Sequence, residues 1–132
     1  MVAGRPLAFN GVPLDDHNSA VASAIALVFS NRLRRSKLLS RRLDEIMEAE
    51  CSLCVASVLS GALHDIGKSS PKYQEGIGRG ASFWLHEMVG ASIIVEAGEL
   101  LIEKGNYRGA LLMRLVSWAV ARHHSAMEDR HP

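Results

Sequence analysis

The sequence has few aromatic residues, few prolines and only two cysteines. Aromatic side chains make up 5% of its 132 residues, and there are 4 prolines. Two cysteines are too few for the disulfide framework of a small secreted scaffold. With 48% hydrophobic and 22% charged residues, the composition is that of an ordinary globular protein and argues against disorder. The length fits one domain over residues 1–132, since single hydrophobic cores commonly occur at about 100 to 150 residues.

Long hydrophobic runs are also missing. The longest, residues 51–63 (CSLCVASVLSGAL), is interrupted by serines and is shorter than the roughly 20 residues that span a bilayer. It therefore predicts a buried helix. The N-terminus lacks the basic region followed by an apolar region that a secretory signal needs. We expect a cytoplasmic protein with no membrane partner.

The net charge is +1, which gives no strong attraction to nucleic acid. Residues 31–43 nonetheless carry six basic residues and no acidic one, and such clusters favour phosphate backbones. A solvated helix end would have the same composition, so both interpretations stay open. The candidate nucleic-acid-binding residues are Arg32, Arg34, Arg35, Lys37, Arg41 and Arg42.

Apolar residues recur at three- and four-residue spacing, and no alternating strand pattern is visible. This periodicity predicts an all-α fold. An antiparallel helical bundle is expected, because helices joined by short loops pack antiparallel. Asp15 or Asp16 is expected to cap the first helix, and a short helical turn is expected within residues 69–80. The expected helices span about residues 15–35, 41–64, 82–104 and 107–124.

The same periodicity assigns side chains to the core. Ile46 of the second helix is expected to face inward, as are Ile93 and Leu100 of the third. Cys51 and Cys54 form a CxxC, but a redox CxxC belongs at a strand-to-helix junction and a structural zinc site needs more ligands. Both cysteines are therefore interpreted as small core residues.

The histidines coincide with the expected helix ends. Because successive helices alternate in direction, these ends meet on one side of the bundle. Each histidine also continues an apolar stripe, which points it inward. The residues are His17 at the start of the first helix, His64 and Asp65 at the end of the second, His86 at the start of the third, and His123 and His124 at the end of the fourth.

Five inward imidazoles beside a carboxylate indicate a metal site. Without a cation, many buried polar groups would need partners, and protonated imidazoles would repel one another. Neutral imidazoles and carboxylates are good ligands for Mn, Fe, Co, Ni or Zn. A carboxylate can also bridge two cations, and Asp65 is the natural bridge.

One pattern runs through most of the chain: an aspartate-histidine pair, an HDxGK motif and three later histidines. Its segments are Asp16-His17, ALHDIGKSSPKYQ at residues 62–74, His86, and His123-His124. This pattern resembles the HD superfamily of metal-dependent phosphohydrolases and, more narrowly, the HD nuclease of CRISPR interference systems. The fold that the resemblance implies is the HD-type helical bundle.

The resemblance also implies two divalent metal ions, with Mn, Ni, Co, Fe or Mg as candidates. Their protein ligands would share one carboxylate: His17, His64 and Asp65 for the first ion, and Asp65, His86, His123 and His124 for the second.

Lys68, in the same motif, is implied as a catalytic residue together with Asp65. It would aid the scissile phosphate or stabilise Asp65. The alternative for Lys68 is a surface lysine in a turn.

The implied function is metal-dependent hydrolysis of phosphodiester bonds in single-stranded DNA, with RNA as a further substrate. The implied partners are a CRISPR helicase and effector complex. Two alternatives stay open. One is an HD-type nucleotide phosphohydrolase, and the other is a non-catalytic, metal-binding helical module that docks on a helicase or effector complex.

One position departs from the family pattern. The family usually completes the shell of the first metal with an aspartate on a later helix. Beyond His124 the only acidic residues are Glu128 and Asp129, and Asp129 lies close to the histidine pair. We therefore expect either a chain truncated at its C-terminus or a short variant whose first metal site is incomplete.

Overall fold

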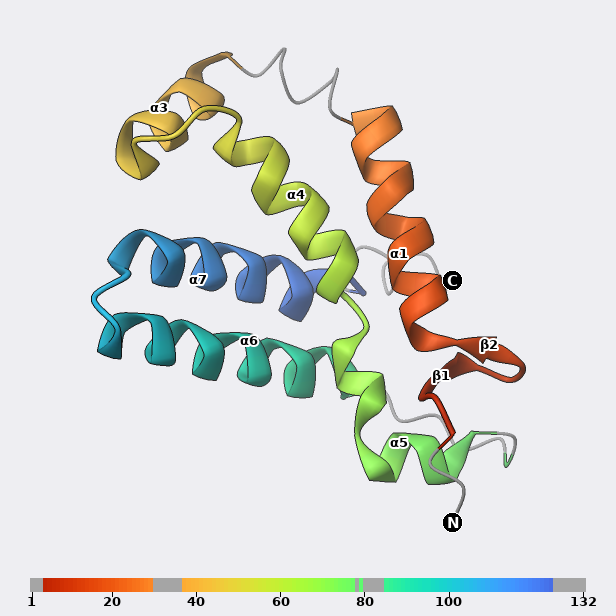
Figure 1. Ribbon diagram of the computed structural model, residues 1–132. Helices are drawn as coiled ribbons and strands as arrows, with labels where there is room; N and C mark the ends of the chain where they lie inside the picture. Colours follow the sequence, from red (N-terminus) through yellow and green to blue (C-terminus); the bar gives the residue numbers. More distant parts are fainter. Residues whose placement is uncertain (1–3, 30–36, 78, 80–84, 125–132) are drawn as a thin grey trace, which may run out of the picture.

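The computed structural model describes residues 4–29, 37–77, 79 and 85–124. Two short strands precede a series of helices, which confirms the predicted all-α fold (Figure 1). A π-helix, η1, continues the first α-helix, and a 3-10 helix, η2, follows α4. The elements are β1 Leu7–Phe9, β2 Val12–Pro13, α1 Leu14–Ala24, η1 Ile25–Phe29, α3 Lys37–Met47, α4 Ser52–Leu63, η2 Ile66–Ser69, α5 Pro71–Gly76, α6 His86–Glu103 and α7 Tyr107–Arg122.

The helices α6 and α7 form an antiparallel hairpin, which α4 meets near the end of α7 (Figure 1). Gly105, with a φ of 74°, forms the turn between them, where its left-handed backbone suits glycine. Asn106 then caps α7, because its side chain accepts a hydrogen bond of 2.9 Å from the backbone N–H of Gly109. The predicted third and fourth helices are thus confirmed over the described residues, with the break at the predicted position, and residues 82–84 of the third lie outside the described residues.

The core lies where α6, α7, α4 and η2 meet. Ile94, Val116 and Val120 are its fully buried members, and burying each such side chain stabilises the fold by roughly 1.5–3 kcal/mol. Ser117 adds a buried hydrogen bond of 3.1 Å from its Oγ to the carbonyl oxygen of Ala91. The partly buried side chains packed against this core are Leu59, Leu63, Ile66 and Met113.

The predicted second helix, residues 41–64, is wrong as a single element. It consists of α3 and α4, separated by a corner in which Glu48 and Cys51 have φ values of 48° and 60°. Asp44 stabilises the corner, since its Oδ1 accepts a hydrogen bond of 2.7 Å from the backbone N–H of Ser52. In the predicted first helix, residues 15–35, the α-helix ends at Ala24 and η1 continues it to Phe29, while residues 30–35 lie outside the described residues.

Several predicted core positions are wrong. Cys51 is exposed because it lies in the corner before α4. Ile46 is 58% exposed, Ile93 is 40% exposed and Leu100 is 57% exposed, whereas Ile94 is 2% exposed. The helix α6 packs against α7 through the neighbouring face, so its buried stripe is rotated by about one residue from the predicted one.

The hairpin of β1 and β2 was not predicted, because strands of three and two residues are too short for an alternating pattern. Its second strand leads directly into α1, whose N-cap is Pro13. The prediction that Asp15 or Asp16 caps this helix is therefore wrong, and both carboxylates instead pair with Arg5. The short helical turn expected within residues 69–80 is confirmed as α5.

No single helix among the described residues is long and apolar enough to cross a membrane. One bent pair, Lys37–Met47 with Ser52–Ser69, satisfies that length and composition test only when its two parts are taken together.

Candidate metal centre

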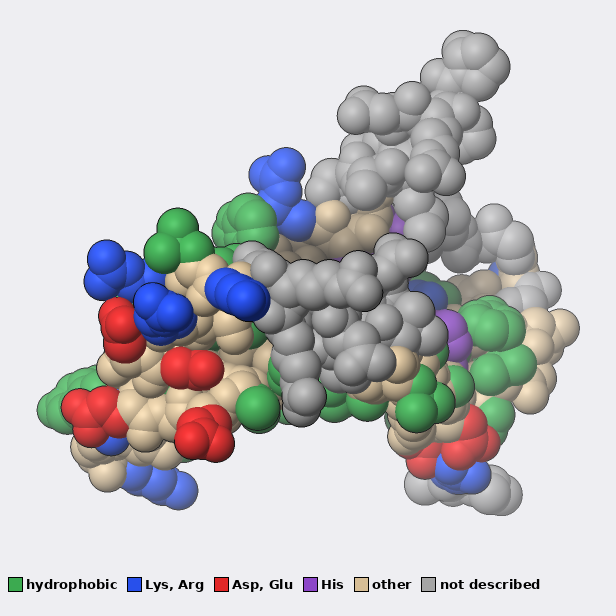
Figure 2. All heavy atoms as spheres, turned by 90° about the horizontal axis from the view of Figure 1, so that it is seen from above, with side chains coloured by type: hydrophobic (Ala, Val, Ile, Leu, Met, Phe, Trp, Pro, Cys, Tyr) green, Lys and Arg blue, Asp and Glu red, His purple; other side chains and the backbone are tan. Residues whose placement is uncertain are grey.

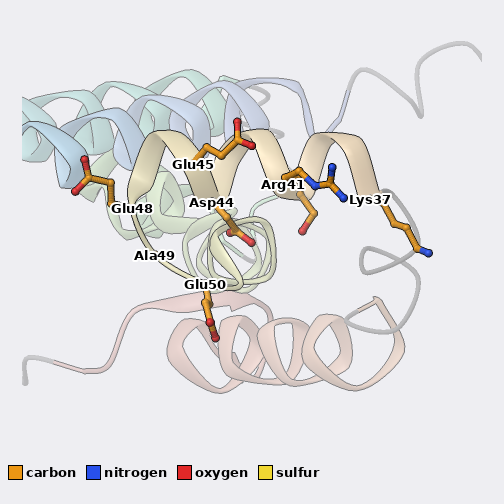
Figure 3. Close-up of a pocket in the computed structure, with 8 residues that line it drawn as sticks. Lys37, Arg41, Asp44, Glu45, Glu48, Ala49 and Glu50 are labelled. Atoms are coloured by element: carbon orange, nitrogen blue, oxygen red, sulfur yellow. The ribbon is translucent and has the colours of Figure 1, made fainter.

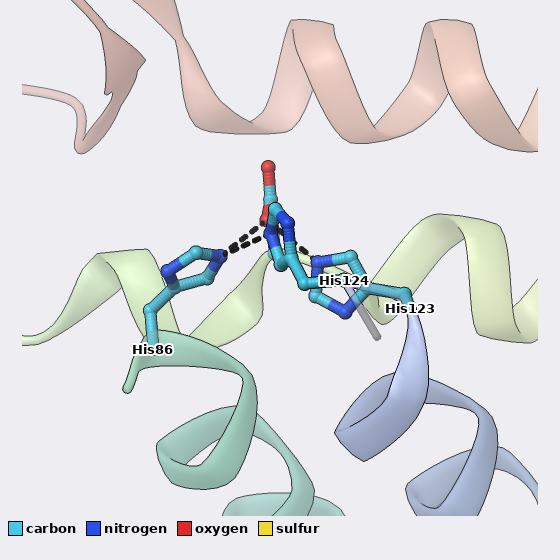
Figure 4. A group of neighbouring side chains, drawn as sticks. His86, His123 and His124 are labelled. Atoms are coloured by element: carbon cyan, nitrogen blue, oxygen red, sulfur yellow. Dashed lines mark hydrogen bonds and ion pairs between the residues drawn. The ribbon is translucent and has the colours of Figure 1, made fainter. Parts of the chain in front are cut away.

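The structure brings all five predicted histidines and Asp65 to one end of the helices. The end of α1 that follows β2 lies beside the end of α4, the start of α6 and the end of α7 (Figure 1). Figure 4 shows the imidazoles of His86, His123 and His124 turned toward one centre. The ligand atoms come from α1 (His17), from the residues after α4 (His64, Asp65), from the start of α6 (His86) and from the residues after α7 (His123, His124).

One oxygen of the Asp65 carboxylate faces the first two histidines. Asp65 Oδ2 lies 3.3 Å from His17 Nε2 and 3.3 Å from His64 Nε2. Lys68 contacts the same oxygen, with its Nζ at 2.6 Å and its side chain 13% exposed. Lys68 is therefore a largely buried partner of Asp65, and the alternative of a surface lysine in a turn is wrong.

The other oxygen faces the later histidines. Asp65 Oδ1 lies 3.1 Å from His86 Nε2 and 3.5 Å from His123 Nε2. His124 completes this side, with its Nε2 3.1 Å from that of His86. The two oxygens of one carboxylate are thus divided between two sets of imidazoles.

These sets define two groups that could hold a metal ion. Within each group, one ligand atom from every residue lies within 4.8 Å of the others. We call them the three-ligand group (His17, His64, Asp65) and the four-ligand group (Asp65, His86, His123, His124).

Two of the imidazoles are held in the form that binds metals. The Nδ1 of His64 lies 2.7 Å from the carbonyl oxygen of Gly61, and that of His123 lies 2.6 Å from the carbonyl oxygen of Val120. A carbonyl oxygen can only accept, so Nδ1 must carry the proton in both rings. The neutral ring then presents the lone pair of Nε2 to the centre, as a metal ligand requires.

The polar atoms at the centre fit a cation. Asp65 Oδ1 and His123 Nε2 are buried and have no hydrogen-bond partner within the described part of the chain. Leaving such groups unsatisfied is costly. A divalent cation would be bound by both atoms at once, and by the facing Nε2 atoms of His86 and His124.

The charged form of Asp65 is strongly favoured. Burial opposes its ionisation, but the imidazoles of His123, His64 and His86 and the Lys68 ammonium together hold the pKa of this carboxyl far below its usual range. Asp65 is therefore an anion at neutral pH and can act as a bridging ligand.

One histidine of each group, His64 and His124, has a shifted pKa, and the two shifts have opposite directions. Burial lowers the pKa of His64, but its contacts with Asp65 and with the carbonyl of Gly61 outweigh burial and raise it overall. Burial and the nearby rings of His123 and His86 lower the pKa of His124. His124 of the four-ligand group therefore stays neutral to a lower pH than His64 of the three-ligand group.

Gly67, the glycine of the HDxGK motif, supports the centre through its position next to α6. A Cβ at this position would lie 1.8 Å from the carbonyl oxygen of His86 and 2.7 Å from the backbone nitrogen of Gly90. Only glycine allows η2 to approach the start of α6 this closely. Gly67, the third residue after the histidine of HDIGK, therefore allows Asp65 to lie against His86.

The described part of the predicted nucleic-acid-binding cluster lies away from this centre. Lys37, Arg41 and Arg42 belong to α3, at the far end of α4 from His64 (Figure 1). The other members, Arg32, Arg34 and Arg35, lie outside the described residues. Seen from above, acidic and basic side chains are interspersed over the part of the surface where α3 lies (Figure 2).

A pocket beside α3 has the same mixed character (Figure 3). Arg42 also pairs with Glu45, at 3.3 Å. A nucleic-acid-binding role for this cluster stays a prediction. The charged residues that line the pocket are Lys37, Arg41, Asp44, Glu45, Glu48 and Glu50.

Comparison with known proteins agrees with this centre. The HD domain family model matches residues 31–131. The chain belongs to the HD domain family. Members of this family are typically metal-dependent phosphohydrolases, and the family implies binding of divalent metal ions. The match includes every ligand of the four-ligand group and begins after His17. No curated protein and no solved structure matches the chain.

Proposed function

We propose that this HD domain hydrolyses phosphodiester bonds of single-stranded nucleic acid, DNA and also RNA, with two divalent ions held at the centre. One observation carries the proposal: the two oxygens of Asp65 face two separate sets of imidazoles. Two-metal hydrolytic sites that act on phosphate esters use a shared carboxylate in this way.

The residues of the chain define how such a site would work. When bound, the divalent ions supply Lewis-acid stabilisation of phosphoryl oxygens and make a water molecule acidic enough to attack. Asp65 would hold the two ions together from opposite oxygens. Lys68, 2.6 Å from Asp65, would bring its ammonium group near a phosphate bound at the centre, where negative charge would increase during the reaction.

A single strand is the favoured substrate because of where the centre lies. The ligands meet at helix ends, and several of their side chains are largely buried, with His86 at 8% and His64 at 17% exposure. A flexible strand can bring its backbone into such a site more easily than a duplex can. The sequence resemblance extends the proposal to a helicase and a CRISPR effector complex as partners.

The proposal is tested by loading metal-free protein with Mn²⁺, Ni²⁺, Co²⁺ or Mg²⁺ and assaying labelled single strands, duplexes and a panel of nucleotides. We expect cleavage of single strands, reduced about 10³-fold in Asp65→Asn, because loss of a bridging charge removes several kcal/mol of stabilisation. Glu103→Gln, an exposed carboxylate at the end of α6 away from the centre, is the matched control and should keep full activity.

Other outcomes would replace the proposal. Turnover of nucleotides without strand cleavage would identify a nucleotide phosphohydrolase. Metal binding with neither activity would identify a non-catalytic module.

A further inference from the structure

Phe9 is a half-exposed aromatic side chain beside the three-ligand group. It ends β1 and is 48% exposed. Its ring contacts the imidazole of His17 edge-on, with the two ring centroids 5.4 Å apart and the planes at 75°. His17 in turn lies 3.3 Å from Asp65. An aromatic ring with free surface therefore lies immediately next to the candidate metal ligands.

The backbone before Phe9 is held by the side chain of Gln74 on α5. Its Oε1 accepts a hydrogen bond of 2.9 Å from the N–H of Leu7, and its Nε2 donates one of 2.9 Å to the carbonyl of Leu7. The second proton of Nε2 is donated to the carbonyl of Lys68, at 2.6 Å. Gln74 thus takes the place of a neighbouring strand for β1 and ties it to the turn that carries Lys68.

Tyr73 holds the next residue of the strand. Its hydroxyl donates a hydrogen bond of 2.8 Å to the carbonyl of Ala8, which is completely buried. Leu7 and Ala8 are therefore both fixed from α5, and Phe9 follows them directly. This arrangement orders the hairpin before any ligand arrives, which lowers the entropy lost on binding.

We propose that Phe9 is a stacking platform for a nucleobase of the substrate, with Tyr73 and Gln74 as positioning residues. A base adjoining the phosphate at the metal centre would lie against the exposed part of the Phe9 ring. Stacking of this kind accepts any base, because every base has a π-face. The proposal rests on the proposed function and adds the recognition of bases to the recognition of phosphate.

The test compares two single strands of equal length, oligothymidine and a strand whose central nucleotides are abasic. The metal-loaded protein is assayed beside its variants Phe9→Ala, Phe9→Leu and Phe9→Trp. Loss of one stacked base should raise KM for oligothymidine about tenfold in Phe9→Ala, with little change in kcat. Phe9→Leu, which keeps an apolar contact with His17, should behave like Phe9→Ala, and Phe9→Trp should restore the wild-type KM.

The matched control is Tyr107→Ala. Tyr107 is 70% exposed and begins α7, about 24 Å along the helix from the metal-binding end at 1.5 Å per residue. It should leave KM unchanged for both strands. Phe9→Ala should likewise leave KM for the abasic strand unchanged, because that strand offers no base to stack.

Two results would overturn the proposal that Phe9 is a stacking platform. One is an unchanged KM for oligothymidine in both Phe9→Ala and Phe9→Leu. The other is an equal loss on the abasic strand, as expected if Phe9 only supported His17. Either result leaves strand cleavage by the wild type intact, so it is distinguishable from failure of the proposed function. If the wild type cleaves neither strand, the same comparison is made on binding, by fluorescence anisotropy.

Discussion

The three-ligand and four-ligand groups share Asp65 but differ in completeness and in burial. Among the described residues, the four-ligand group has four protein ligands, and its His86 side chain is 8% exposed. The three-ligand group has three, and its His17 side chain is 25% exposed. A more complete and more buried set of protein ligands binds an ion more tightly, whereas open coordination positions leave room for water and substrate. The four-ligand group is therefore expected to hold its ion, and the three-ligand group to exchange it.

The difference follows from the helices that carry the ligands. His86, His123 and His124 lie at the ends of α6 and α7 opposite the Gly105 turn, directly beside the core residue Val120. His17 lies on α1, which packs on α4 rather than on the α6–α7 hairpin. The four-ligand group thus depends on the best-packed part of the fold.

Gly67→Ala should have the largest effect and should act mainly on the four-ligand group. The added Cβ would lie 1.8 Å from the carbonyl oxygen of His86, so η2 must move away from α6. We expect a loss of about 3 kcal/mol in the free energy of unfolding, measured by urea denaturation of the metal-free protein. Gly4→Ala, where a Cβ meets open space, is the control. Equal stability of the two variants would contradict the role given to Gly67.

Removal of single histidines should separate the two groups. In His124→Ala, the tighter of two Mn²⁺ binding steps should weaken about 100-fold. Changing a residue that only orients a metal ligand already weakens metal binding by about 10- to 100-fold, and loss of a ligand itself should cost at least as much. In His17→Ala, the tighter step should be unchanged and the weaker one lost. Isothermal titration calorimetry measures both steps. Loss of the tighter step in His17→Ala would reverse the assignment.

A change of pH should have the smallest effect on metal affinity. Its direction follows from the shifted pKa values of His64 and His124. A proton competes with the metal for each imidazole. The raised pKa of His64 lets the proton compete at higher pH, and the lowered pKa of His124 delays it to lower pH. As the pH falls from 8 to 6, the weaker step should lose about tenfold in affinity before the tighter step changes. Co²⁺ absorption spectra at each pH would follow the two steps, and simultaneous loss of both would contradict the comparison.

Much of the centre was predictable from the sequence because its ligands mark helix ends. The positions of His17, His64, His86 and His123 needed only the order and direction of the helices, which periodicity supplies. The motif HDIGK then placed Lys68 beside Asp65. These inferences depend on local sequence and on a simple topology.

Other features could not be predicted because they depend on contacts between distant segments. The corner at Glu48 and Cys51 is stabilised by Asp44, and no glycine or proline marks it. In the hairpin, β1 pairs with β2 and is also held by Gln74 and Tyr73, more than 60 residues away in sequence, which hydrogen-bond to its backbone. The buried face of α6 was displaced by one residue because Ile94 rather than Ile93 meets α7.

The most direct test of a shared Asp65 is anomalous X-ray scattering at the manganese edge from crystals of the Mn²⁺-loaded protein. We expect two peaks about 3.5–4 Å apart, one contacting each oxygen of the Asp65 carboxylate. The peak at the four-ligand group should have the higher occupancy. A single peak, or two peaks of which one does not contact Asp65, would contradict the assignment of Asp65 as a ligand shared by two metal ions.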